Sequence, residues 1–346
     1  MTNTLLSIQH SSLVHIFILG FFGFAFSILL TPIYTTIAYR YRWWKKLRTT
    51  TLTGEKATEL QKLHGEKHRR NIPTMAGLIM VVAVSVVTII FNLDRGQTWL
   101  PLAALLGAGL VGLLDDYINI KGDGSGVAGL RSKIKLLLVA SVASVSGWWF
   151  YQKDGFNSIH LPGSGMLMVG WLIIPIFVLV VVATANAVNI SDGLDGLAGG
   201  LLATSFTAYS VIALFQGKYA LATFCFTIVG SLLSYIWFNI FPARFFMGDV
   251  GSFALGTTLG VVAMMTDTLF LLPVIGFVFV AEAGSVILQV LSKKLRNGKK
   301  IFRISPIHHH YEAIGWPETK VTMRFWVLGT VFASVGILLA IVGGFV

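Results

Sequence analysis

The chain has little charge and almost no cysteine. Charged residues make up 12% of its 346 residues, whereas a soluble domain usually carries about 25%. This shortage argues against an ordinary soluble protein. The single cysteine, Cys225, excludes a disulfide within the chain. The sequence also contains no low-complexity tract and no internal repeat.

The sequence contains many long apolar runs. Hydrophobic residues make up 55% of the chain and the mean hydropathy is +0.77. A helical crossing needs about 20 apolar residues, so this length accommodates roughly ten. We predict an all-α integral membrane protein that forms a single polytopic domain over residues 1–346. The expected spans are 12–38, 74–92, 98–114, 134–151, 170–188, 197–215, 219–240, 251–266, 269–291 and 323–345.

The basic residues predict the orientation. All but three of the 26 lysines and arginines fall in one alternating set of connections or at its edges; the exceptions are Arg95, Lys153 and Lys218. Because Lys and Arg accumulate in cytoplasmic loops, the basic side is cytoplasmic and both termini lie outside. The net charge of +11 is therefore mostly a topology signal and does not indicate nucleic-acid binding.

Aspartates mark the ends of these apolar runs. Asp115, Asp116, Asp192, Asp195 and Asp249 all fall at the predicted cytoplasmic side. A carboxylate beside hydrocarbon is costly unless it holds a cation or a substrate. Their shared location predicts a metal-dependent active site at the inner membrane surface.

Three segments contain these acids. Asp115 and Asp116 repel each other, and Mg²⁺ bound through few carboxylates would relieve that repulsion. Residues 186–200 combine polar side chains with glycines, which favours a ligand pocket over a simple turn. Asp249 lies between two glycines near a helix N-terminus, where it is equally well explained as a phosphate-site residue or as a plain N-cap.

A fourth segment contains three consecutive histidines, His308, His309 and His310. They cannot all face one ion from a regular helix. Phosphate contact or proton transfer is therefore favoured over a zinc site, and a solvated loop is the alternative. Carboxylates, glycines, basic residues and histidines together suit phosphoryl transfer, and a site beside the bilayer suggests a lipid acceptor.

These four segments, in this order, resemble those of the polyprenyl-phosphate N-acetylhexosamine-1-phosphate transferases. Residues 305–312 (SPIHHHYE), 315–318 (GWPE) and 324–326 (RFW) resemble the phospho-N-acetylmuramoyl-pentapeptide transferase branch. The resemblance extends from about residue 69 onward. It departs from the family pattern at Arg69, where that pattern has lysine, and the region 45–68 matches it least.

The resemblance implies a reaction and its partners. Phospho-MurNAc-pentapeptide would pass from UDP-MurNAc-pentapeptide to undecaprenyl phosphate, giving lipid I and UMP, with Mg²⁺ as cofactor. The expected location is the bacterial cytoplasmic (inner) membrane, and the expected assembly is a homodimer. The sequence leaves open whether the lipid phosphate attacks directly or an aspartate first forms a covalent intermediate.

The resemblance also implies residue roles. The implied catalytic residues are Asp115, Asp116, Asp249, His309 and His310. Asp249 is the implied metal ligand, with Asp115 and Asp116 as candidate further ligands. The implied substrate-binding residues are Arg69, Lys121, Lys133, Asn189, Asp192, Gly193, Leu194, Asp195, Asn239, Phe246 and His308.

Two alternative functions are open at this stage. One is the same chemistry with UDP-GlcNAc as donor, and the other is a secondary transporter, which would carry acids at mid-membrane. Glu282, within the predicted span 269–291, is such an intramembrane acid. It either has a function or forms a hydrogen bond to a neighbouring helix.

Overall fold

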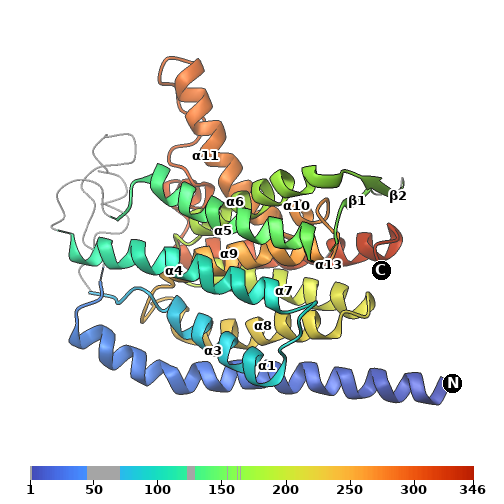
Figure 1. Ribbon diagram of the computed structural model, residues 1–346. Coiled ribbons are helices and arrows are strands. Elements are labelled where there is room, and N and C mark those ends of the chain that lie inside the picture. Colours follow the sequence, from blue (N-terminus) through green and yellow to red (C-terminus); the bar gives the residue numbers. More distant parts are fainter. Residues whose placement is uncertain (1, 45–70, 123–128, 154, 162, 164) are drawn as a thin grey trace.

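The computed structural model describes residues 2–44, 71–122, 129–153, 155–161, 163 and 165–346. Within these residues the chain forms a bundle of long helices (Figure 1). The long helices are α1 (Thr2–Arg40), α3 (Gly77–Phe91), α4 (Trp99–Lys121), α5 (Ser132–Gln152), α6 (Ile173–Ser191), α7 (Leu197–Phe215), α8 (Tyr219–Asn239), α9 (Gly248–Met265), α11 (Phe277–Leu295) and α13 (Glu318–Val342). The shorter elements are β1 (Ser158–Leu161), β2 (Gly165–Met168), the 3-10 helix η1 (Gly170–Leu172), α10 (Leu272–Ile275) and α12 (Ile307–Ala313).

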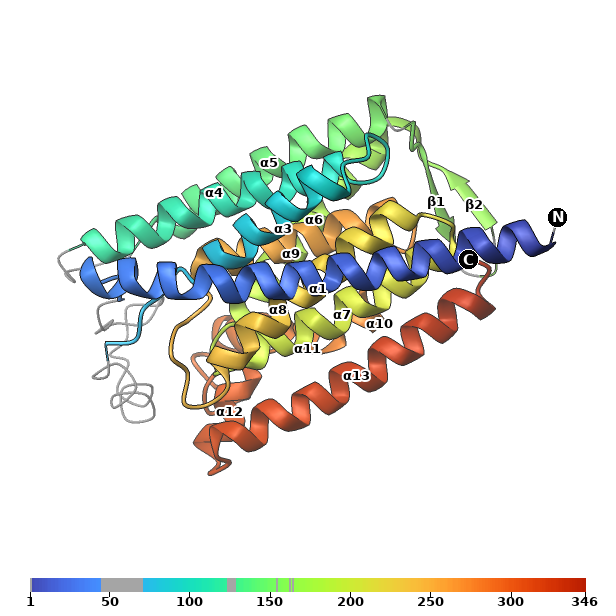
Figure 2. The same ribbon diagram turned by 90° about the horizontal axis from the view of Figure 1, so that it is seen from below.

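Eight of the helices in the described part of the chain are long and apolar enough to cross a membrane. Of the other two long helices, α3 is apolar but has only 15 residues, and α11 contains Glu282 and two lysines. The chain is therefore a mostly helical, multi-pass membrane protein. Both termini lie at the same end of the bundle (Figures 1 and 2).

The observed elements differ from the expected ones in three places. An antiparallel hairpin, β1–β2, pairs Ser158 with Met168, so the fold is not purely helical. Helix α4 continues to Lys121 instead of ending near residue 114, which places the paired aspartates inside the helix. The run 269–291 forms two helices, α10 and α11, separated at Gly276.

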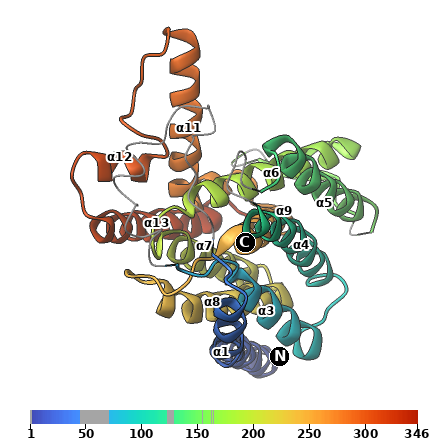
Figure 3. The same cartoon turned by 90° about the vertical axis from the view of Figure 1, so that its left-hand side faces the viewer.

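Helix α9 lies at the centre of the bundle and packs against α3, α4, α6 and α7 (Figure 3). Small residues allow these approaches, as is common where apolar helices pack in membranes. A Cβ on Gly112 of α4 would lie against the Asp249 carbonyl group, 2.5 Å from its carbon. A Cβ on Gly77 of α3 would overlap the backbone of Gly251. The first turn of α9 is thus held directly against α3 and α4.

A polar cluster holds the opposite end of the bundle, near both termini. Asp267 Oδ1 accepts a 3.1 Å hydrogen bond from the backbone N–H of His160 in the hairpin. Lys218 Nζ donates to the Met265 carbonyl at 2.7 Å. Burial raises the pKa of the Asp267 carboxyl above its usual range and lowers the pKa of the Lys218 ammonium.

Candidate active site

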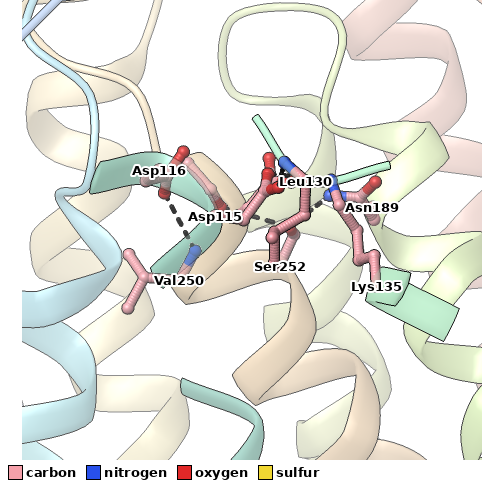
Figure 4. A network of polar contacts seen from close by, with 9 residues as sticks. Asp115, Asp116, Leu130, Lys135, Asn189, Val250 and Ser252 are labelled. Carbon is pink, nitrogen blue, oxygen red and sulfur yellow. Dashed lines mark hydrogen bonds and ion pairs between the residues drawn. The ribbon is translucent and has the colours of Figure 1, made fainter. Parts of the chain in front are cut away.

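Lys135 joins two aspartates that are far apart in the sequence. Its Nζ lies 2.8 Å from Asp115 Oδ2 (Figure 4) and 2.6 Å from Asp249 Oδ2. The three side chains come from the last turns of α4, the first turn of α5 and the first turn of α9. The Asp115 side chain is only 1% exposed, and its Oδ1 also accepts a 2.6 Å hydrogen bond from the Leu130 N–H.

Asp116 is fixed against the first turn of α9. Its buried Oδ2 accepts a 3.0 Å hydrogen bond from the Val250 N–H. Gly248, which begins α9, has a φ of +74°, a conformation that glycine adopts without the penalty of a Cβ. A Cβ there would also lie 2.5 Å from Asp116 Oδ2. Glycine at this position therefore allows the positive φ and also leaves room for the Asp116 carboxylate.

Two further segments complete this end of the bundle. Asn189, near the end of α6, donates to Ser252 Oγ of α9 at 2.9 Å (Figure 4). The segment before α3 pairs with the segment before α9, because the Phe246 N–H donates to the Pro73 carbonyl and the Ala76 N–H donates to the Phe246 carbonyl. The half-buried Phe246 is thereby placed beside α3 and α9.

The loop after α6 is held by buried side chains. The Asp195 carboxylate accepts a 2.9 Å hydrogen bond from the Ala243 N–H, and its own backbone N–H donates to Glu318 Oε1 at 2.7 Å. Asn239 accepts from the Gly196 N–H at 2.8 Å and donates to the Phe245 carbonyl at 2.8 Å. Asp195 and Asn239 are both 3% exposed, so in this structure both brace the loop.

The three histidines lie on α12 and have three different partners. His308 Nδ1 is 2.8 Å from Glu282 Oε2, and His309 Nδ1 is 2.7 Å from Glu312 Oε2. His310 Nδ1 accepts a 3.2 Å hydrogen bond from the Arg303 N–H. The histidines therefore diverge, as expected for consecutive residues on a helix.

The remaining predicted residues have different environments. Asp192 and Gly193 are half-buried, and Leu194 is buried. Lys121 is exposed and lies over the Tyr117 ring at 5.7 Å. Arg69 lies outside the described residues.

Sequence reasoning missed Lys135 and named Lys133, which is exposed in the structure. Both lysines lie in the first turn of α5, but residues two apart on a helix do not share a face. Only Lys135 reaches the carboxylates. The spacing alone could not choose between them, because the orientation of α5 about its axis comes from its packing against α4 and α6.

The site offers oxygen donors to a cation. Among the residues that the structure describes, Asp115 and Asp249 contact Lys135, and the Asp116 carboxylate accepts from the Val250 N–H beside them. No cluster of three or more His, Cys, Asp and Glu side chains in the described ranges is arranged to hold a metal by itself. This combination suits Mg²⁺, which usually keeps several waters and takes one or two carboxylates together with substrate phosphates.

Comparison with known proteins identifies the family. The family model for glycosyl transferase family 4 matches residues 97–267. A phospho-N-acetylmuramoyl-pentapeptide-transferase of Geobacillus sp. (strain WCH70) is 39% identical over 323 residues, which cover 91% of this chain and 94% of that relative. The chain belongs to the phospho-N-acetylmuramoyl-pentapeptide transferase family.

Other members of this family are similarly close. The phospho-N-acetylmuramoyl-pentapeptide-transferase of Chloroflexus aurantiacus (strain ATCC 29366 / DSM 635 / J-10-fl) is 41% identical over 79% of this chain and 78% of its own length. That of Syntrophus aciditrophicus (strain SB) is 39% identical over 78% and 80%. The residues matched by the family model contain Asp115, Lys135, Asn189 and Asp249, and the three histidines follow them. Membership in a transferase family favours the enzyme over the transporter.

Proposed function

We propose that this protein transfers phospho-MurNAc-pentapeptide from UDP-MurNAc-pentapeptide to undecaprenyl phosphate, releasing UMP and forming lipid I. The observation that supports this most strongly is the convergence of Asp115 and Asp249 on Lys135. A lysine among carboxylates at the end of apolar helices suits the binding of a diphosphate and a divalent cation together. The relatives of this chain are named phospho-N-acetylmuramoyl-pentapeptide-transferases.

Mg²⁺ is the proposed cofactor. Asp249 is the proposed ligand, and Asp115 and Asp116 are the candidate further ligands. When bound, the cation offsets negative charge on the diphosphate of the donor. Its site adjoins Lys135, which is only 17% exposed and can hold a phosphate oxygen as a compact positive charge.

The transfer makes one bond and breaks one. An oxygen of the lipid phosphate attacks the β-phosphorus of the donor, and the bond from that phosphorus to the bridging oxygen of UMP breaks. Asp115 or Asp116 takes the proton of a protonated lipid phosphate. We favour this direct route, because a phosphate monoester is already anionic near neutral pH. In the alternative double displacement, an aspartate attacks first.

An apolar groove along α6 suits the lipid chain. It has a volume of about 370 Å³ and lies between α6, α9, α10 and α11, where its walls are almost entirely apolar. Leu179, Val180, Leu272 and Phe279 are among the lining residues. Ala187, which lies toward the same end of α6 as Asn189, also lines this groove. A polyprenyl tail would bury apolar surface there.

The orientation of the bundle follows from its basic residues. The basic end of the bundle faces the cytoplasm, so both termini lie outside after ten crossings of the bacterial inner membrane, with α3 and α11 as the two crossings that are shorter or more polar. The active form is a homodimer. The nucleoside end of the donor lies against Gly193, Leu194 and Asp195, with Asn239 near the uracil and Phe246 stacked on it. The histidines of α12 are further polar residues of the site.

Release of UMP tests the function. Purified protein with Mg²⁺, undecaprenyl phosphate and UDP-MurNAc-pentapeptide is expected to release UMP, and Asp249→Asn is expected to abolish release without unfolding the protein. Asp94→Asn is the matched control, because it removes one acid from an exposed loop between α3 and α4. Normal turnover by Asp249→Asn would remove this residue from the mechanism. UMP release with UDP-GlcNAc alone would assign the other sugar.

A further inference from the structure

Helix α11 has one polar face and one apolar face. Glu282, Ser285, Gln289 and Ser292 are buried and spaced three or four residues apart, which places them on one side of the helix. The exposed apolar residues include Ile287, Leu288 and Leu291. The C-terminal half of α11 stands away from the bundle (Figures 1 and 3), so its polar side must find partners elsewhere.

The segment that returns from α11 to α12 supplies those partners. Gln289 Oε1 accepts hydrogen bonds from the Ile301 and Phe302 N–H groups, both at 3.0 Å, and its Nε2 donates to the Phe302 carbonyl at 2.8 Å. Ser292 Oγ donates to the Lys299 carbonyl at 2.9 Å. On the returning segment these contacts involve backbone groups alone. They therefore fix the path of that segment and not the direction of any of its side chains.

Glu282 differs because it binds a side chain. Its carboxylate is fully buried, and Oε2 lies 2.8 Å from Nδ1 of His308, which is also fully buried. A buried carboxylate is costly without hydrogen-bond donors. With Glu282 ionised, its carboxylate only accepts hydrogen bonds, which places the proton of this pair on His308 Nδ1.

The other ring nitrogen of His308 points toward the substrate loop. A Cβ on Gly193 would lie against His308 Nε2 and 2.9 Å from Cε1. The imidazole is therefore held between the Glu282 carboxylate on one side and the backbone at Gly193 on the other. Gly193 lies next to Asp192 and Leu194, within the loop proposed to bind the donor.

We propose that Glu282 is a positioning residue that fixes the orientation and the Nδ1 proton of His308, so that the imidazole supports the backbone at Gly193 in the loop proposed to bind the donor. This inference rests on the proposed function for the identity of the donor. Glu282 acts through His308 and does not itself contact substrate. Carboxylate partners of this kind commonly set the tautomer of a functional imidazole, and their loss typically costs about 10- to 100-fold in activity at metal-bound histidines.

A double-mutant cycle tests the coupling. Glu282→Gln is expected to lower kcat/KM for UMP release by about 10- to 100-fold in the wild-type background, with little change in thermal stability. In a His308→Asn background the same change is expected to cost less than about 3-fold, because its target is absent. Ser285→Ala is the matched control, since it removes a buried hydroxyl one turn away whose hydrogen bond, within the described part of the chain, goes to the Glu282 backbone carbonyl. Equal losses in both backgrounds would overturn the proposal.

A second variant and an NMR measurement test the coupling between Glu282 and His308 independently. Gly193→Ala pushes on the ring from the opposite side, and its loss of kcat/KM is expected to be larger with His308 present than in the His308→Asn background. This variant decides the coupling if Glu282→Gln does not fold. Proton NMR of ¹⁵N-histidine protein needs no substrate. The His308 Nδ1–H resonance, assigned by its loss in His308→Asn, is expected to move upfield in Glu282→Gln, because a neutral acceptor bonds more weakly.

These readouts separate the inference from the function. Absence of UMP release by wild-type protein would reject the proposed reaction, and the NMR shift would still decide whether Glu282 orients His308. An unchanged resonance in Glu282→Gln would overturn the inference even in a fully active enzyme.

Discussion

The contact between α4 and α9 should control the geometry of the site. Gly112 lies one turn before Asp115 on α4, and a Cβ at this position would lie 2.5 Å from the Asp249 carbonyl carbon and 2.6 Å from Val250 Cα. Backbone atoms cannot rotate away as a side chain can. Restoring ordinary contact at 3.4 Å requires the helices to separate by about 1 Å, which stretches the pairing of Asp115 and Asp249 through Lys135.

The magnitude follows from two opposing effects. Overpacking costs about 1–3 kcal/mol, whereas replacing a helical glycine by alanine returns about 1 kcal/mol of helix propensity. Gly112→Ala is therefore expected to lower the free energy of unfolding by up to about 2 kcal/mol. Its effect on turnover is expected to be larger, about 100-fold, because a misplacement of about 1 Å in a catalytic constellation has that effect.

Gly107→Ala on the same helix provides the control. The nearest atoms to its Cβ would belong to the Val142 side chain, at 3.1 Å. The same gain in helix propensity therefore comes with a neighbour that can move. UMP release and thermal unfolding should be measured for both variants. Near-normal release by Gly112→Ala, or an equal loss in Gly107→Ala, would refute the link between this contact and the site.

Three other predictions follow from single side chains. Lys135→Met should abolish UMP release and make thermal stability depend more strongly on Mg²⁺ than in wild type, because the carboxylates lose their ammonium; Lys133→Met should do neither. Glu318→Ala should raise KM for the donor more than it lowers kcat, since it releases the Asp195 N–H; an unchanged KM would count against this. The raised pKa of Asp267 means that the folded state holds its proton more tightly, so stability from this group is gained as pH falls toward the usual aspartate range and lost as pH rises. Asp267→Asn should remove that pH-dependent part of the melting temperature, and identical pH profiles would contradict it.

The sequence by itself determined the class of protein, and it predicted the end of the bundle at which the chemistry takes place. The scarcity of charge and the lengths of the apolar runs require a membrane bundle, since backbone polar groups in lipid are satisfied within helices. Asp115, Asp116 and Asp249 are expensive beside hydrocarbon wherever they occur, so a functional reason for them could be inferred without coordinates. Residues 305–312 pointed to the transferase branch, and the curated relatives bear that out.

Only the tertiary structure decided which side chains meet. Lys135 and not Lys133 reaches the aspartates because packing sets the rotation of α5, and one residue of helix turns a side chain by about 100°. Glu282 finds His308 across a loop of more than ten residues, and no local pattern encodes that return path. The propensities that form each helix act between neighbours in the chain, whereas the site also depends on contacts between residues as distant in the sequence as Lys135 and Asp249.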